Sequence, residues 1–90
     1  MTGISQQSVA SAVVASAAAI TAPSPVFHVS GTAEIDTINP PPLFNGPWIE
    51  IIPDGIFTTG TTGNIALAST AVVNKTLRLT YDGTKWYPSY

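Results

Sequence analysis

The chain has 90 residues and a mass of 9.4 kDa, which allows one small domain and excludes a second folded unit. Charged residues make up 9% of it, where about 25% is ordinary, and the net charge of −2 excludes disorder driven by charge repulsion. A chain of this size buries only about 63% of its surface on folding. Because it has no cysteine and a single histidine, we expect partner chains to give the support that disulfides or a metal give other small domains.

The first segment of the chain is rich in Ala, Ser and Val, and it carries no charged residue. Its composition changes at Pro23 and Pro25, so we divide the chain into an N-terminal anchoring arm over 1–25 and a β body over 26–90. Alanine favours a helix, which Pro23 would end, but Ser, Val and Thr are middling helix formers, so a helix and an extended arm both remain open. In either form, four small or apolar residues are predicted to anchor the arm to another chain: Val9, Val13, Ala17 and Ile20.

Composition argues against three other interpretations of the sequence. A secretory signal would need basic residues near the start, and residues 1–7 have none. A membrane span would need about 20 apolar residues, and the stretch Val9–Ala22 is shorter and contains two serines. Nucleic-acid binding through a basic stripe would need more than Lys75, Arg78 and Lys85. We therefore predict neither a membrane nor a nucleic-acid partner.

From Val26 onward the sequence predicts a mainly β fold with short strands. Runs of Val, Ile, Thr, Tyr, Phe and Trp alternate with Gly, Pro and Asn, which is typical of strands and turns. The triple proline Pro40–Pro42 blocks sheet pairing, since it donates no backbone hydrogen bond. We expect strands over 26–30, 33–38, 48–52, 56–58, 76–81 and 84–87, with a further short strand or turn over 65–68.

The C-terminal hairpin is the clearest local signal. Asp82-Gly83 between two β-rich runs favours a two-residue type I′ turn, in which both central residues have positive φ. This turn would place Leu79 opposite Trp86, and it would put both on one face together with Leu77 and Tyr81. We predict that this apolar face is the core face.

The catalytic inventory of the chain is thin. His28 is the only imidazole, and no nucleophile motif accompanies it, so we expect it to be a structural strand residue. Glu34 and Asp36 lie two apart on one predicted strand, with Cα atoms about 6.6 Å apart, a spacing compatible with the acid and base of a glycosidase. The simpler alternative is a solvated strand face. We predict no enzymatic activity, no cofactor and no metal site.

The large side chains of the β body are predicted to form its interface with other chains. Tryptophan and tyrosine bury large areas and keep a polar tip, which suits an interface. An alternative is a sugar-binding platform formed by Trp48, Trp86 and Tyr87, so glycan remains an alternative partner. The predicted interface residues are Trp48, Ile51, Phe57, Leu79, Trp86 and Tyr87.

Residues 29–90 resemble small Thr/Gly-rich β modules of tailed-bacteriophage virion proteins, which occur in head decoration proteins, head fibres and tail fibres. The resemblance is carried by Val29–Thr32, Ile38–Pro41 and Phe44–Gly46, then by Ile51–Thr59, Gly63–Ala68 and Tyr81–Pro88. It implies a homotrimer with strands wound or stacked around a threefold axis.

The resemblance implies a non-enzymatic structural protein of the virion, assembled in the host cytoplasm. At 90 residues, a capsid decoration, cement or head-fibre protein fits the length better than a whole receptor-binding tail fibre. Such a protein would dock through its N-terminal segment on the major capsid protein or on other virion proteins. The alternative is a host-surface glycan-binding module of a tail fibre or spike.

Overall fold

The computed structural model of the chain describes residues 12–90, and over this range it is all-β. These residues contain no helix, and therefore none that is long and apolar enough to cross a membrane. The strands are β1 (Val13–Ala15), β2 (Ala19–Thr21), β3 (Val26–Ser30), β4 (Thr37–Asn39), β5 (Trp48–Pro53), β6 (Thr58–Thr59), β7 (Ser69–Thr70), β8 (Leu77–Tyr81) and β9 (Trp86–Ser89).

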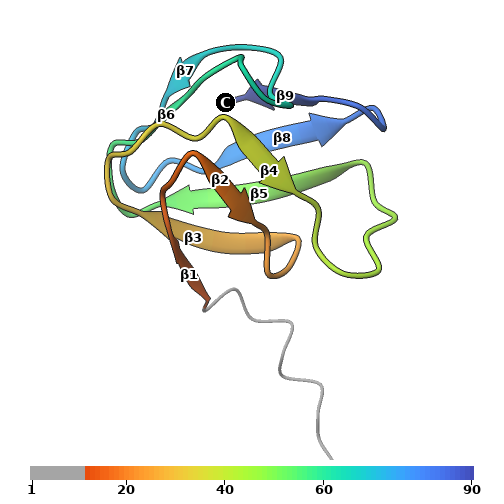
Figure 1. Cartoon of the computed structure of the whole chain (residues 1–90). Helices are drawn as coiled ribbons and strands as arrows, with labels where there is room; N and C mark the ends of the chain where they lie inside the picture. The colour runs from red at the N-terminus through yellow and green to blue at the C-terminus, as the bar shows by residue number, and fades with distance from the viewer. Residues whose placement is uncertain (1–11) are drawn as a thin grey trace, which may run out of the picture.

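The strands form two layers (Figure 1). One layer is a five-stranded sheet in the order β1-β3-β5-β8-β9, in which β1, β3 and β5 run parallel and β5, β8 and β9 antiparallel. The second layer contains the parallel pair β2–β4 and the antiparallel pair β6–β7, which cover one face of the large sheet. The other face of the large sheet therefore lies outside the core.

The core lies between these layers, and strand alternation determines which side chains enter it. Along β5, Ile49 and Ile51 are fully buried while Trp48 is exposed, as the period of two requires. Full burial of a side chain of this size contributes about 1.5–3 kcal/mol. The core joins side chains from both layers: Ile20, Ala22, Phe27, Val29, Ile35, Ile38, Ile49, Ile51, Phe57, Ile65, Ala71, Leu77, Leu79 and Trp86.

The described part of the predicted arm, residues 12–25, belongs to this fold. β1 pairs with β3 and β2 with β4, and Ile20 is 4% exposed. The helical alternative is therefore wrong for residues 13–21, and the boundary at residue 25 does not separate an arm from the body there. The physical reason is that β3 and β4 supply the hydrogen-bond partners that a short isolated segment lacks. Val9 lies outside the described residues.

The C-terminal hairpin has the predicted core face but a different turn. Tyr81 pairs with Trp86 and Leu79 with Pro88, a shift of two residues that leaves each side chain on its predicted face. Gly83 has φ +97, whereas Asp82 is not among the residues with positive φ, so the type I′ prediction is wrong. The cause is the Asp82 carboxylate, because its Oδ1 accepts hydrogen bonds from the backbone N–H groups of Thr84 and Lys85, both at 2.8 Å.

Candidate interaction surface

The outer face of β5, β8 and β9 carries a row of three side chains. Trp48 pairs with Thr80, and Thr80 pairs with Tyr87, so the row crosses the three strands. Trp48 is 42% exposed and Tyr87 is 45% exposed. Because neighbouring strands lie about 4.8 Å apart, two aromatic side chains flank a threonine on a sheet face that points away from the core. We term these three residues the aromatic row.

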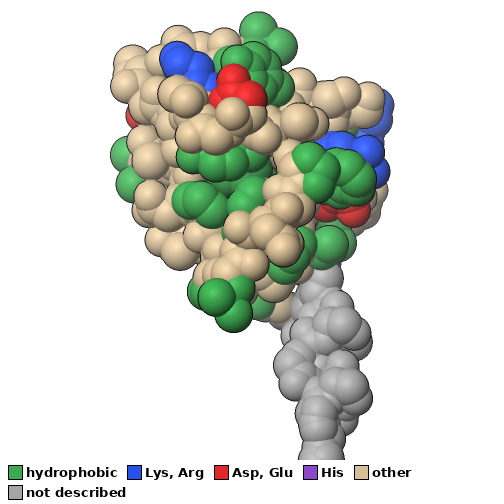
Figure 2. Space-filling model, turned by 90° about the vertical axis from the view of Figure 1, so that its right-hand side faces the viewer, with side chains coloured by type: hydrophobic (Ala, Val, Ile, Leu, Met, Phe, Trp, Pro, Cys, Tyr) green, Lys and Arg blue, Asp and Glu red, His purple; other side chains and the backbone are tan. Residues whose placement is uncertain are grey.

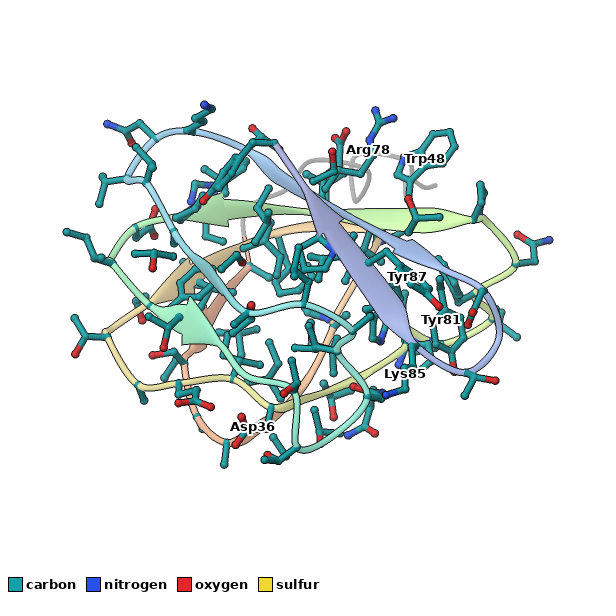
Figure 3. All side chains as sticks on the ribbon, turned by 90° about the horizontal axis from the view of Figure 1, so that it is seen from above. Asp36, Trp48, Arg78, Tyr81, Lys85 and Tyr87 are labelled. Carbon is teal, nitrogen blue, oxygen red and sulfur yellow. The ribbon has the colours of Figure 1, made fainter. Side chains whose placement is uncertain are left out.

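An ion pair beside the aromatic row, between Arg78 and Glu50, holds the ring of Trp48. The Arg78 guanidinium donates to Glu50 Oε2 at 3.0 and 3.3 Å, and its carbon lies 4.5 Å from the centre of the Trp48 ring. Figure 3 shows Trp48 and Arg78 together, pointing away from the sheet. An exposed ion pair contributes little to the free energy of folding, but the stacked guanidinium restricts the ring. Trp, Tyr and Arg are the residue types that dominate binding energy at protein interfaces.

The Tyr87 side chain is fixed at the other end of the row. Its hydroxyl donates to Asp82 Oδ2 at 2.9 Å. The pKa of Asp82 is lowered by hydrogen bonds from the backbone N–H groups of Lys85 and Thr84 and then by the Tyr87 hydroxyl. The same bond to Asp82, together with the charge of that carboxylate, raises the pKa of Tyr87. The aromatic row is therefore preorganised by hydrogen bonds at one end and by cation–π stacking at the other.

The structure corrects most of the predicted interface residues. Trp48 and Tyr87 lie on the surface, whereas Ile51, Phe57, Leu79 and Trp86 are fully buried within this one chain. The Trp86 indole N–H donates to the backbone carbonyl of Ile38 at 2.9 Å, so both the ring and its polar atom have their partners inside the core. These four side chains fill the core of the chain itself, and the sugar-platform alternative loses Trp86 for the same reason.

Of the three predicted anchoring residues that the structure describes, two are exposed and one is buried. Val13 is exposed on β1, at the edge of the five-stranded sheet, and Ala17 is exposed after it. Ile20 is a core residue. Of the predicted anchoring residues that the structure describes, Val13 and Ala17 are therefore the two that are accessible to another chain.

The loop between β4 and β5 presents an apolar residue that the sequence patterns did not single out. Leu43 is fully exposed and has φ +55. The Phe44 backbone N–H donates to the Pro41 carbonyl at 3.2 Å and closes a turn around it. Figure 2 shows hydrophobic side chains exposed at this end of the molecule. A signal was available in the sequence, because Pro42 suits the second position of such a turn.

The two acidic residues singled out in the sequence do come together. A Cβ at Gly60 would collide with both Glu34 Oε2 and Asp36 Oδ1, so the two carboxyl groups meet over this glycine. Asp36 Oδ1 is buried and accepts no hydrogen bond from the described residues. A hydrogen bond to Asp36 and the repulsion between the two charges raise the pKa of Glu34. Because both carboxylate oxygens lie next to the same point above Gly60, the two groups are closer than the about 5–9.5 Å that separates glycosidase carboxyls.

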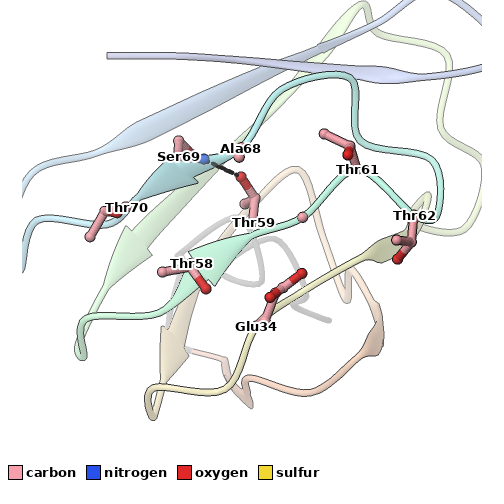
Figure 4. Close-up of a pocket in the computed structure, with 9 residues that line it drawn as sticks. Glu34, Thr58, Thr59, Thr61, Thr62, Ala68, Ser69 and Thr70 are labelled. Carbon is pink, nitrogen blue, oxygen red and sulfur yellow. Dashed lines mark hydrogen bonds between the residues drawn. The ribbon is translucent and has the colours of Figure 1, made fainter.

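Glu34 also lines a shallow hollow of about 530 Å³ (Figure 4). Its other walls are mainly threonine and serine, and the Thr59 hydroxyl is already bonded to Ser69 N and Leu67 O. Among residues 12–90, no three acidic, His or Cys side chains gather as metal ligands. His28 lies apart from this hollow on β3, with its Nδ1 2.8 Å from Asp54 Oδ1.

Comparison with known proteins adds no family to this description. No protein-family model matches the chain, and neither the curated proteins nor the solved structures include a match. The aromatic row contains two residues of the types that dominate binding energy at interfaces, Trp48 and Tyr87, and the turn at Leu43 exposes an apolar side chain.

Proposed function

We propose that this chain is a non-enzymatic structural protein of a tailed-bacteriophage virion, assembled in the host cytoplasm. In this proposal it is a capsid decoration, cement or head-fibre protein that forms a homotrimer and docks on the major capsid protein or another virion protein. The observation that carries the assembly role is the preorganised aromatic row of Trp48, Thr80 and Tyr87 with Arg78 stacked on it. The virion is proposed from the sequence resemblance of residues 29–90.

The surface as a whole supports a role in assembly. Large apolar side chains are exposed at several separate places, while only eight residues carry a formal charge. Two of these charges, on Arg78 and Glu50, neutralise one another, and the Lys75 ammonium lies 4.9 Å from the centre of the Tyr90 ring. A surface with few free charges has weak protection against association with other chains.

Docking through the N-terminal segment is supported by the position of β1. This strand is at one edge of the five-stranded sheet, and residues 1–11, which include Val9, precede it in the chain. An edge strand offers its outer backbone groups to a strand of another protein. The exposed Val13 side chain lies on the same strand. Capsid contacts made by Val9 and Val13 would therefore continue from the sheet edge.

Electron microscopy of virions tests the placement. Particles that lack the protein should have vacant sites on the capsid, and adding the purified protein back should refill them. Particles with complete capsids and altered tails would contradict the head placement.

Light scattering tests the assembly role with purified protein. The proposal predicts the mass of a trimer, and Trp48→Ala should weaken association by about tenfold or more. Thr61→Ala, in an exposed turn of the other layer, is the matched control and should leave the mass unchanged. A wild-type chain that is monomeric at every concentration would contradict the trimer.

A second candidate function is binding of host-surface glycan, as in a tail-fibre or spike module. The observation that favours it is the flat aromatic row, because aromatic rings stack on the apolar faces of sugars. Only Trp48 and Tyr87 are available for such contacts. Saturable binding on a glycan array that Trp48→Ala abolishes, with the oligomeric mass unchanged, would support this candidate over the decoration role.

A further inference from the structure

The loop between β4 and β5 contains an asparagine followed directly by a glycine, Asn45-Gly46 (Figure 1). The side-chain amide of an asparagine reacts with the backbone nitrogen of the next residue and releases ammonia, which is one reason why asparagine is thermolabile. A glycine in the next position shields its nitrogen least, because it has no side chain. The sequence therefore places its most reactive asparagine in this loop.

The structure leaves both reacting groups of this pair accessible. Asn45 and Gly46 are exposed, and neither the side chain of Asn45 nor the backbone N–H of Gly46 makes a hydrogen bond within the described part of the chain. The contacts that hold the loop lie on either side of the pair. Before it, the Phe44 ring packs against Tyr81, with ring centres 6.3 Å apart, and after it Pro47 O accepts from Tyr81 N at 2.7 Å. None of these contacts occupies a reacting atom.

The other asparagines of the chain are each blocked in a different way. Asn39 is followed by a proline, whose nitrogen carries no proton to lose. The side-chain amide of Asn64 uses both its oxygen and its nitrogen in hydrogen bonds to the backbone of Ile38. The residue after Asn74 donates its backbone N–H to Val72 O at 3.0 Å, so the attacking nitrogen is already bonded. We therefore expect these three side chains to react slowly in the folded chain.

Two aspartates, Asp54 and Asp82, also precede a glycine, but the structure keeps them from the same reaction. An ionised carboxylate resists attack by a nitrogen, because it is already negatively charged. Asp54 Oδ1 lies 2.8 Å from His28 Nδ1. Asp82 accepts hydrogen bonds from two backbone N–H groups and from the Tyr87 hydroxyl, all of which favour its ionised form. Asn45 is therefore the residue of this kind that the structure leaves unprotected.

We propose that Asn45 is a site of spontaneous deamidation. The Gly46 nitrogen attacks the side-chain carbon Cγ of Asn45, and the new C–N bond closes a cyclic succinimide. The bond from Cγ to Nδ2 breaks, and the amide leaves as ammonia together with the proton that Gly46 N gives up. Water then opens the ring at either of its carbonyl groups. The product at position 45 is aspartate or isoaspartate, and both carry one carboxylate.

The reaction puts a charge into an uncharged part of the chain. Residues 37–49 contain no Asp, Glu, Lys or Arg, and one new carboxylate takes the net charge from −2 to −3. This charge lies in the loop directly before Trp48, where the aromatic row begins. The isoaspartate product also lengthens the backbone by one carbon between Phe44 and Pro47, whose contacts hold the loop. Aged chains therefore differ from new ones in charge and in loop geometry at this end of the row.

Peptide mass spectrometry of the purified full chain, aged at slightly alkaline pH, tests the proposal. The peptide that contains Asn45 should gain about 1 Da, and it should also be labelled by an isoaspartyl methyltransferase. Its conversion should be about tenfold or more faster than that of the peptides with Asn39, Asn64 or Asn74. A parallel sample aged in urea gives the rate of the unfolded chain. The rate at Asn45 in the folded chain should lie within about tenfold of that rate, because the loop is exposed.

Gly46→Ala is the matched variant. An added Cβ at Gly46 would meet the Phe44 ring at 3.9 Å, an ordinary contact, and Gly46 is not among the glycines with positive φ. The variant should therefore keep the melting temperature of the wild type, while its methyl group hinders the attacking nitrogen and slows deamidation about tenfold. Thr61→Ala, in the other layer, is the control and should deamidate like the wild type.

Two outcomes would overturn the proposal. One is an Asn45 that stays intact in the folded chain while it converts in urea, because the loop would then hold the reacting groups apart. The other is equal deamidation of Gly46→Ala and the wild type. Neither measurement depends on assembly or on the virion, so this proposal and the proposed function can each fail while the other holds.

Discussion

The side-chain amide of Asn64 makes two hydrogen bonds to the backbone of Ile38. Ile38 N donates to Asn64 Oδ1, and Asn64 Nδ2 donates to Ile38 O, both at 2.9 Å. One side chain thus takes the role that a neighbouring strand would have for β4. The backbone carbonyl of Asn64 also accepts from Trp86 N at 2.8 Å, so this residue connects the second layer to the C-terminal hairpin.

Asn64→Ala should lower the free energy of unfolding by about 2–3 kcal/mol, because it leaves backbone groups of a buried residue without a partner. Denaturation in urea measures the loss. Asn45→Ala changes an exposed asparagine in the β4–β5 loop and should stay within about 0.5 kcal/mol of the wild type. Equal effects of the two substitutions would mean that the Asn64 bonds do not stabilise the fold.

Gly83→Val should destabilise the hairpin by about 1–3 kcal/mol. Gly83 has φ +97, and an added Cβ would meet no atom within 4 Å, so the cost comes from the backbone conformation and not from a clash. Thr84→Val places the same side chain one residue later, without positive φ, and is the control. Thermal melts of the two variants should differ by several degrees, and coincident melts would refute this account of the turn.

Leu43 and Asn74 both have positive φ, each in a turn closed by one backbone hydrogen bond, from Phe44 N to Pro41 O and from Lys75 N to Val72 O. Exchanging leucine and asparagine between these two positions should have opposite effects on stability. Leu43→Asn should stabilise the isolated chain by up to about 1 kcal/mol, since asparagine tolerates positive φ better than leucine does. Asn74→Leu should destabilise it by about 1 kcal/mol for the same reason. Urea titrations at low protein concentration keep association out of the measurement. Destabilisation by Leu43→Asn would show that the leucine makes contacts within its own chain.

The pKa of Glu34 predicts how stability changes with pH. Its pKa is raised above the ordinary value of 4.5 by Asp36, so the folded state binds the proton more tightly than the unfolded state does. The stabilisation that Glu34 contributes is complete at pH values below its ordinary pKa, and it is lost as the pH rises through its raised pKa. In Glu34→Gln, whose side chain stays neutral, this fall should disappear from melting temperatures recorded across that interval. An unchanged pH profile would contradict the contact between the two carboxyls.

The pKa shift of Asp82 has the opposite sign to that of Glu34. Its pKa is lowered, so its contribution is present above the ordinary value of 3.8 and is lost as the pH falls through the lowered value. Tyr87→Phe removes one donor and leaves those of Lys85 and Thr84, which contribute more. The pKa of Asp82, measured by carboxyl NMR titration, should therefore rise part of the way toward 3.8. A return to the full ordinary value would mean that the backbone donors contribute nothing.

The sequence by itself determined those features that depend on neighbouring residues along the chain. Local composition predicted the strands over 26–30 and 48–52, and the strand period of two identified the core face of the hairpin. That face survived the error in the turn, because a shift of two residues leaves every side chain on the same side. The all-β class from Val26 onward followed from the same local patterns.

Only the tertiary structure decided which partners each segment meets. Residues 13–21 became strands because β3 and β4 lie beside them, and an Ala/Ser/Val composition contains no pattern that predicts this pairing. Trp86 and Phe57 are core residues, whereas Trp48 is a surface residue. The reason is similar, because burial depends on which strand face the second layer covers. The residues of that layer come from distant parts of the chain. A large aromatic residue has the same chemistry in a core and at an interface, so its sequence neighbours alone do not distinguish the two.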